Sequence, residues 1–242
     1  MPRLRDLYEV HRGRRLVEPF AGGLAVALGL LPERALLSDV NPHVINLYRW
    51  LSEGLTIEMA MENDAACYYA ARQRFNGLLA DGGVATREAA CLFYYLNRTG
   101  YNGLCRFNSG GGFNVPFGRY KTIRYARDFS AYAPLLSRWE FRRGDFEGIP
   151  LRPDDFLYAD PPYDVEFTRN SQDDFRWDDQ VRLARWLAAH PGPVVASNQA
   201  TPRVLDLYRD LGFVIEVLPA PRRIACNGNR EPADEMLATR RL

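Results

Sequence analysis

The sequence predicts an α/β fold in which a parallel sheet covered by helices is interrupted by a second, helical and loop-rich domain. Two observations support this prediction. Short apolar strands alternate with amphipathic helices at the start of the chain and again in its second half, which is typical of a parallel sheet. Residues 53–135 lack that alternation. We therefore expect residues 1–52 and 136–242 to form the sheet domain and residues 53–135 to form an insertion.

The first half of the sheet is predicted from residues 4–51. Residues 4–11 have the spacing of a short helix, and residues 15–20 have the composition of a strand. A Gly22-Gly23 break then precedes an apolar helix at 24–31. Residues 35–38 form a second buried strand, and residues 44–51 again show helical spacing.

The insertion carries different signals. Residues 56–98 are expected to be helical throughout, and residues 99–120, which are dense in glycine and aromatic residues, form a hairpin or an ordered loop. The sheet resumes with strands at 138–143, 155–158, 194–197, 213–218 and 236–238. Helices at 181–189 and 202–211 separate three of them.

Composition excludes several classes of protein. Of the 242 residues 47% are hydrophobic, which is sufficient for a core and excludes wholesale disorder. The sequence has no apolar run of 18 residues and no signal-peptide pattern, so we expect a cytoplasmic protein without a membrane partner. Four widely spaced cysteines and three histidines predict reduced thiols and no metal site.

The net charge of +1 hides an uneven distribution. Residues 140–179 contain twelve acidic and five basic side chains. Residues 97–127 contain no acidic side chain and six basic ones, interleaved with aromatic residues: Arg98, Arg106, Arg119, Lys121, Arg124 and Arg127. The basic stretch is either a solvated loop or a surface that faces phosphates.

Two candidate ligand-binding segments end predicted strands, where parallel sheets bind their ligands. Residues 18–23 combine small residues with a helix start, so the backbone can approach a ligand closely; a tight turn without a ligand is the alternative. Asp39 lies near the position at which nucleotide-binding sheets place an acid on ribose hydroxyls. Its alternative role is to cap the next helix, which Asn41 would also do.

A third segment, Asp160-Pro161-Pro162-Tyr163, follows the strand predicted at 155–158. Two prolines make it a rigid projection with a carboxylate, backbone carbonyls and one aromatic face. A carboxylate and a proline carbonyl can each accept one hydrogen of an exocyclic amino group, so the segment suits a planar base that carries such a group. The alternative is a loop punctuated by prolines.

These segments together resemble the DNA (adenine-N6) methyltransferases of the Dam type, from about residue 16 to residue 238. Residues 18–22 are similar to the first cofactor motif of that family, and Asp39 with Asn41 to the second. Residues 95–121 are similar to its DNA-contacting hairpin almost position by position, and this narrowly distributed motif decides the family. Residues 222–228 and Glu235 match its C-terminal segment.

The resemblance implies a Rossmann-like sheet that binds S-adenosylmethionine, with no metal, and an inserted domain that recognises double-stranded DNA. It also implies methyl transfer to N6 of an adenine flipped out of the duplex, most commonly in GATC. The implied catalytic residues are Asp160, Pro161, Pro162 and Tyr163. The implied cofactor-binding residues are Pro19, Phe20, Gly22, Asp39, Asp145, Phe146 and Asp160.

The resemblance also implies roles in the hairpin. Arg106 would read a guanine edge, and Leu104 and Pro116 would contact a thymine methyl group. Tyr101 or Asn102 would fill the gap left by the flipped base. The phosphate contacts would be Arg98, Asn108, Arg119 and Lys121.

Two departures from the family pattern bear on the cofactor site. The family usually begins with a Lys-Trp-x-Gly-Gly-Lys segment that helps to close the cofactor pocket, and Met1 stands where that segment would end. The family also has a glycine two residues after Gly22, where this chain has Leu24. Gly23 would compensate if the turn shifted by one residue.

Two alternative functions are weighed against this one. The first is an amino-methyltransferase that acts on adenine in rRNA or on N4 of cytosine, and the hairpin argues against it. The second is a DNA-binding module without catalytic activity, and the intact segment from Asp160 to Tyr163 argues against it.

Overall fold

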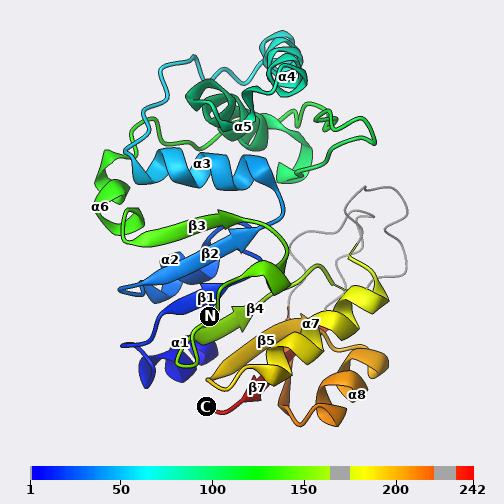
Figure 1. Ribbon diagram of the computed structural model, residues 1–242. Coiled ribbons are helices and arrows are strands. Elements are labelled where there is room, and N and C mark those ends of the chain that lie inside the picture. Colours follow the sequence, from blue (N-terminus) through cyan, green and yellow to red (C-terminus); the bar gives the residue numbers. More distant parts are fainter. Residues whose placement is uncertain (1, 164–174, 221–232) are drawn as a thin grey trace. The chain divides into compact units, whose positions relative to one another are not determined.

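The structure is a computed structural model that describes residues 2–163, 175–220 and 233–242 (Figure 1). These residues fall into two compact units. One unit contains the residues up to 40 and from 138 onward, and the other contains residues 41–137. The C-terminal family match at 222–228 lies outside the described residues.

The first unit is built on a seven-stranded sheet with the order β3-β2-β1-β4-β5-β7-β6. The five neighbouring strands β3, β2, β1, β4 and β5 are parallel, as predicted. Leu16 of β1 pairs with Ala35 on one side and with Phe156 on the other. The strands are β1 (Leu16–Glu18), β2 (Ala35–Asp39), β3 (Trp139–Arg143), β4 (Phe156–Ala159), β5 (Val194–Gln199), β6 (Val214–Ala220) and β7 (Ala233–Arg240).

The predicted parallel sheet also contains an antiparallel strand near one edge. β7 runs antiparallel to both of its neighbours, β5 and β6. β6 and β7 are consecutive in the chain and adjacent in the sheet, which suits antiparallel pairing, because parallel neighbours need a long crossover connection. The sheet is therefore mixed, with five parallel strands that carry the candidate ligand-binding segments.

Helices cover both faces of this sheet. Tyr8 of α1 (Pro2–Glu9) packs edge-on against Phe156, with ring centroids 5.1 Å apart. The next residue, Leu157, belongs to the core formed with Leu183 of α7 (Trp177–Ala189). Successive strand residues point to opposite faces, so α1 and α7 cover opposite sides. The fully buried patterns of β1 and β4 follow from this double cover.

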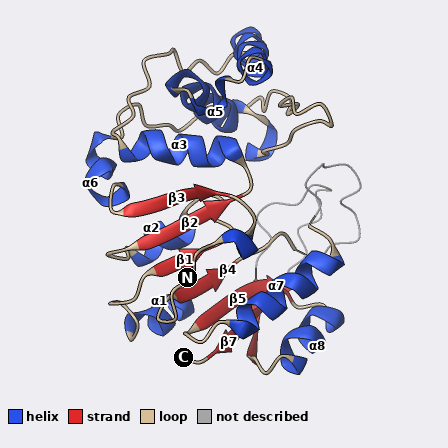
Figure 2. Ribbon diagram, in the orientation of Figure 1, coloured by secondary structure: helices blue, strands red, loops and turns tan. Residues whose placement is uncertain are grey.

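Two further helices complete the unit. α2 (Ala25–Leu30) contacts α1, and α8 (Pro202–Asp210) contacts α7. Figure 2 shows α7 in front of the strands and α2 behind them. A single 3-10 turn, η4 (Phe146–Gly148), follows β3.

The strand order reverses between β1 and β4, at the centre of the parallel sheet. In doubly wound sheets, ligands bind beyond the carboxyl ends of the strands at such a switch point. Glu18 ends β1, Asp39 ends β2 and Asp160 directly follows β4. The fold thus brings all three sequence-predicted segments to one edge of the sheet.

The second unit is helical. Its α-helices are α3 (Pro42–Ser52), α4 (Ala65–Ala80), α5 (Arg87–Thr99) and α6 (Ala133–Leu136), and its 3-10 turns are η1 (Gly83–Ala85), η2 (Tyr101–Gly103) and η3 (Ser130–Tyr132). α3 begins after Asn41, whose Oδ1 accepts a hydrogen bond from the His43 amide. Because α3 packs against α5, the first division between the units falls before α3 rather than after it.

The expectation that residues 56–98 are helical throughout is wrong at both ends of α4. Asp64 caps α4 by accepting a hydrogen bond from the Cys67 amide. Before that cap the chain is extended, and the Ile57 amide donates to the Arg127 carbonyl at 2.7 Å. After α4, η1 separates it from α5. No helix among the described residues is long and apolar enough to cross a membrane.

Candidate active site

The turn after β1 brings two predicted cofactor-binding residues together. The Gly22 amide donates a hydrogen bond of 3.0 Å to Oδ2 of Asp39, which ends the neighbouring strand β2. Gly22 adopts a φ of +45°, in the left-handed region that glycine tolerates best. Pro19 and Phe20 precede it in the same turn. Asn41 rather than Asp39 caps the following helix.

The backbone conformation of Leu24 explains why the family pattern has a glycine at this position. Leu24 is the residue before α2 and has a φ of 57°. Left-handed backbone costs a non-glycine residue roughly 1 kcal/mol or more, so glycine is the favoured residue there. Gly23 is not among the glycines with positive φ, and the compensating shift of the turn does not occur. The Leu24 side chain is buried instead, at 3% exposure.

Asp160 is held by a residue of the adjacent strand. The Ser197 hydroxyl donates a hydrogen bond of 2.9 Å to Asp160 Oδ1, and the Tyr158 hydroxyl lies 2.9 Å from the same Ser197 oxygen. Asp160 is accessible to solvent, yet the surrounding protein desolvates its carboxylate and raises its pKa. The hydrogen bond from Ser197 opposes that rise because it favours the ionised form.

The rest of the segment is fixed by two further hydrogen bonds. Gln180 of α7 donates from Nε2 to the Pro162 carbonyl at 2.8 Å, and buried Asn198 in turn donates to Gln180 Oε1 at 2.9 Å. The Tyr163 hydroxyl donates to Glu235 Oε1 at 3.1 Å. Both ends of the proline pair are therefore tied to the sheet or to α7, which agrees with the rigid projection predicted from the sequence.

Glu18 places a second carboxyl group at the same sheet edge. It is 3% exposed, and its Oε1 has no hydrogen-bond partner among the residues that the structure describes. Burial, with the negative charge of Asp160 as the second cause, raises the pKa of Glu18 from 4.5 to about 8, and the backbone of Ala27 opposes the shift. Burial thus favours the protonated form of Glu18, whose Oε1 is a buried polar atom without a partner in the described part of the chain.

An aromatic cluster lies beside these carboxyl groups. The Phe20 ring lies 6.0 Å from that of Phe146 and 5.5 Å from that of Phe175. Asp145 precedes Phe146, and its Oδ1 accepts a hydrogen bond from the Glu147 amide. The structure thus joins the predicted residues Phe20, Asp145 and Phe146 into one apolar and acidic patch.

The predicted DNA-binding residues lie in the second unit: Arg98 lies in the last turn of α5, and the others lie in the hairpin at 99–121. Two isolated bridges, Gly100 with Phe117 and Phe107 with Phe113, establish the hairpin. Asn108 Oδ1 accepts hydrogen bonds from the Gly110 and Gly112 amides and so shapes its tip. Leu104 is partly buried, and the other predicted residues are exposed: Arg98, Tyr101, Asn102, Arg106, Asn108, Pro116, Arg119 and Lys121.

The Arg106 side chain is held by the opposite arm of the hairpin. Its Nε donates a hydrogen bond of 2.8 Å to Oδ1 of Asn114 on the opposite arm. Arg106 is exposed, so its two terminal guanidinium nitrogens can be reached from solvent. The fork is therefore pre-oriented by the hairpin while it stays accessible.

Sequence reasoning missed Ser197, Gln180 and Arg182 as parts of the site. Ser197 had a detectable signal, because it is a polar residue that ends the apolar run Val194–Ala196 in a buried strand. Gln180 and Arg182 lie on an amphipathic helix and carry no comparable signal, since their role depends on which loops α7 packs against.

Comparison with known proteins shows the family of the chain. A sequence model of the D12 class N6 adenine-specific DNA methyltransferases matches residues 1–222. The chain is 35% identical to the Retron Ec67 DNA adenine methylase of Escherichia coli, over 93% of this chain and 82% of that protein. It is also 35% identical to the DNA N-6-adenine-methyltransferase of Escherichia phage P1, over 90% of this chain and 31% of that protein.

Among solved structures, the chain is similar to the 23S rRNA methyltransferase ErmE, with a TM-score of 0.45 and 12% identity over 99% of this chain and 66% of that one. The match to the family model spans nearly the whole chain and includes the strand ends and the hairpin. The chain therefore belongs to the D12 class of N6 adenine-specific DNA methyltransferases.

Proposed function

We propose that the chain transfers a methyl group from S-adenosylmethionine to N6 of an adenine that is flipped out of double-stranded DNA, at the sequence GATC. The observation that best supports this is the fixed Asp160–Tyr163 segment at the switch point of the sheet. Its carboxylate is accessible to solvent and oriented by Ser197, and its aromatic ring is anchored through Glu235.

The residues at the strand ends fit S-adenosylmethionine. Phe20, which is partly buried and supported from the core by Phe146, offers an apolar surface for the adenine ring, and Asp145 offers an acceptor for its amino group. Asp39 suits the ribose hydroxyls. The Oε1 of buried Glu18, which has no hydrogen-bond partner among the described residues, would accept a hydrogen bond from the amino group at the methionine end of the cofactor. When bound, S-adenosylmethionine supplies an activated methyl group.

The catalytic segment acts by orientation. Asp160 and the Pro161 carbonyl would each accept one N6 hydrogen, so that the nitrogen lone pair faces the methyl group. We assign the Pro161 carbonyl because the Pro162 carbonyl already accepts from Gln180. Tyr163 would stack on the base. None of these contacts can reach an adenine inside a duplex, so the base must be extruded first. Positioning then supplies most of the rate enhancement.

We assign DNA recognition to residues 53–135 and catalysis to residues 1–52 and 136–242. In the hairpin, Arg106 would pair with O6 and N7 of guanine, and Leu104 and Pro116 would contact the thymine methyl group. Tyr101 or Asn102 would fill the gap left by the flipped adenine. Asn108 uses its side-chain oxygen within the turn, which leaves its amide nitrogen to donate to a phosphate, beside Arg98, Arg119 and Lys121.

Transfer of a radiolabelled methyl group tests the proposal. Duplexes that contain GATC should be labelled, whereas duplexes of the same composition with GTAC, and the corresponding RNA, should not. A GATC duplex that already carries N6-methyladenine on both strands should accept no label. Label on RNA or on cytosine would contradict the proposed substrate, and equal labelling of GATC and GTAC would contradict the proposed site.

A further inference from the structure

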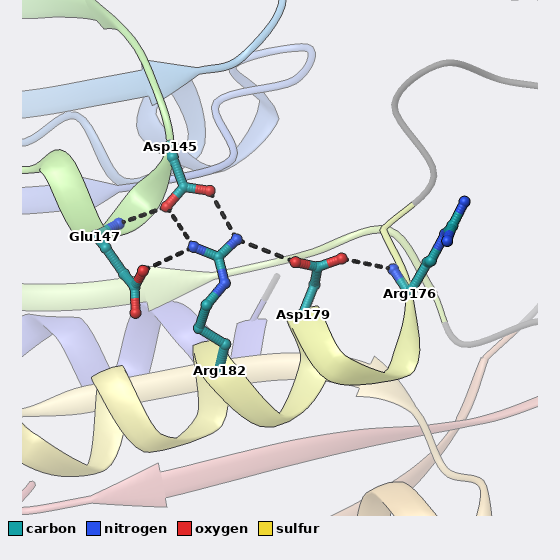
Figure 3. Close-up of polar contacts among 5 residues, drawn as sticks. All are labelled: Asp145, Glu147, Arg176, Asp179 and Arg182. Carbon is teal, nitrogen blue, oxygen red and sulfur yellow. Dashed lines mark hydrogen bonds and ion pairs between the residues drawn. The ribbon is translucent and has the colours of Figure 1, made fainter.

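Arg182 joins three carboxylates beside the aromatic cluster. Its two terminal nitrogens each donate a hydrogen bond of 2.9 Å to one oxygen of Asp145 (Figure 3). One of them also donates to Glu147 at 2.7 Å, and the other to Asp179 at 3.1 Å. Asp179 in turn accepts the Arg176 amide at the start of α7. The guanidinium is therefore fixed from three sides.

The same guanidinium lies over the ring of Phe146, with its central carbon 4.4 Å from the ring centroid. Arg182 thus contacts both members of the Asp145-Phe146 pair, one through paired hydrogen bonds and the other through a cation–π contact. These contacts also lower the pKa of Asp145, chiefly through the hydrogen bonds from Arg182, so that the carboxylate stays ionised. Lysine would not reproduce this geometry, because a single ammonium cannot bridge both oxygens in a plane.

We propose that Arg182 is a positioning residue of the cofactor site, which fixes the Asp145 carboxylate so that it accepts the exocyclic amino group of the cofactor's adenine. This inference rests on the proposed function. Among the described contacts, Asp145 Oδ1 accepts from both Arg182 and Glu147, whereas Oδ2 accepts only from Arg182. Oδ2 therefore retains one accepting position for a further donor.

Loss of Arg182 would affect recognition of adenine more than the rest of cofactor binding. Without the guanidinium, the carboxylates of Asp145, Glu147 and Asp179 lose their shared counter-ion and repel one another. Asp145 would then leave the orientation that favours an amino group. The contacts to ribose and to the methionine end come from other strand ends and would be retained.

The test is a binding measurement with two probes by calorimetry. S-adenosylhomocysteine carries the amino group, and S-inosylhomocysteine has an oxygen in its place. The wild type should prefer the adenosyl compound. Arg182→Met should bind it roughly tenfold more weakly, since a hydrogen bond to a charged group is worth more than about 1.4 kcal/mol. The same variant should lose most of the preference between the probes, and Arg182→Lys should fall between.

Arg185→Met is the matched control, because Arg185 is an exposed arginine on the same helix. It should bind both probes as the wild type does. If Arg182→Met and Arg182→Lys weaken both probes equally, Arg182 has only a structural role and the inference is wrong. The inference is also wrong if neither variant changes the affinity for either probe. A wild type that binds neither probe would instead contradict the proposed function, on which the inference depends.

Discussion

The Ser197 hydroxyl donates a hydrogen bond of 2.9 Å to Oδ1 of Asp160, so a side chain of β5 orients the carboxylate that follows β4. Tyr158 lies behind Ser197, with its hydroxyl 2.9 Å from the Ser197 oxygen. Tyr158 and Ser197 are both buried, so this hydrogen-bonded chain is held by the core of the sheet. The orientation of the Asp160 carboxylate is thus built into the pairing of two parallel strands.

Ser197→Ala should lower the rate of methyl transfer at saturating substrates by about tenfold or more, because it removes a hydrogen bond to a charged group. That bond lowers the pKa of Asp160, so its loss should raise the pKa and move the acid limb of the pH–rate profile to higher pH. Ser197→Thr, which keeps the hydroxyl, should stay near the wild type. An Ala variant with an unchanged profile would show that Ser197 does not act on Asp160.

Glu18 should make the protein less stable as the pH rises above 4.5. Its pKa is about 8 in the folded chain and 4.5 in the unfolded chain, so the folded state holds the extra proton between these values. The free energy of unfolding should therefore fall by about 1.4 kcal/mol for each pH unit in that window. In Glu18→Gln this loss should be absent. Urea unfolding at pH 5 and pH 8 measures this change in the free energy of unfolding. An equal change in the wild type and in Glu18→Gln would refute the raised pKa of Glu18.

The ion pair between Arg15 and Asp155 should matter for stability rather than for catalysis. Its atoms approach to 2.7 Å, and the two side chains are only 9% and 1% exposed. Asp155→Ala leaves a buried guanidinium without its partner and should cost about 3–5 kcal/mol in urea unfolding. Glu216→Ala, which breaks the exposed pair with Arg3, should cost less than about 1 kcal/mol. Similar costs for the two variants would contradict this assignment.

Arg106→Ala should relax the sequence preference at one guanine. The lost discrimination should be about 1–3 kcal/mol, because a guanidinium fork pairs with O6 and N7 of guanine. Lys121→Ala, at a position proposed to contact phosphate, should instead weaken binding to all sequences equally and reduce the salt dependence. Methylation of duplexes substituted at each GATC position distinguishes the two. If the Arg106 variant instead loses methylation equally on all duplexes, the hairpin contacts only the DNA backbone and does not read the guanine.

The local signals in the sequence predicted the parallel part of the sheet well. Apolar runs followed by a glycine turn or a proline pair mark β1 and β4, and the residues that follow them lie at the switch point. The failures involve contacts between distant residues. Residues 56–64 were expected to be helical, but Ile57 pairs with Arg127, far along the chain. α7 begins at Trp177, earlier than the expected 181, because Asp179 accepts the Arg176 amide.

The candidate site divides in the same way. Gly22, Asp39 and Asp160 were predictable because strand ends in a parallel sheet share one edge. Ser197 carried only the signal of a polar residue in a buried strand, and Arg182 carried none. Neither acts within its own segment: Ser197 orients Asp160 across a strand pair, and Arg182 reaches from α7 to the loop after β3. The positive φ of Leu24 was also not predictable from the composition of its turn, because the neighbouring Gly23 would adopt a positive φ more easily.

The proposed methylation of adenine in GATC is tested most directly by mapping N6-methyladenine after the reaction. The purified chain would be incubated with S-adenosylmethionine and unmethylated plasmid, and the modified positions would be read by single-molecule sequencing. We expect methylation of the adenine in GATC by the wild type, and none by Asp160→Ala, which should still bind DNA. Methylation at unrelated adenines would contradict the proposed site. Undiminished methylation by Asp160→Ala would contradict the proposed mechanism.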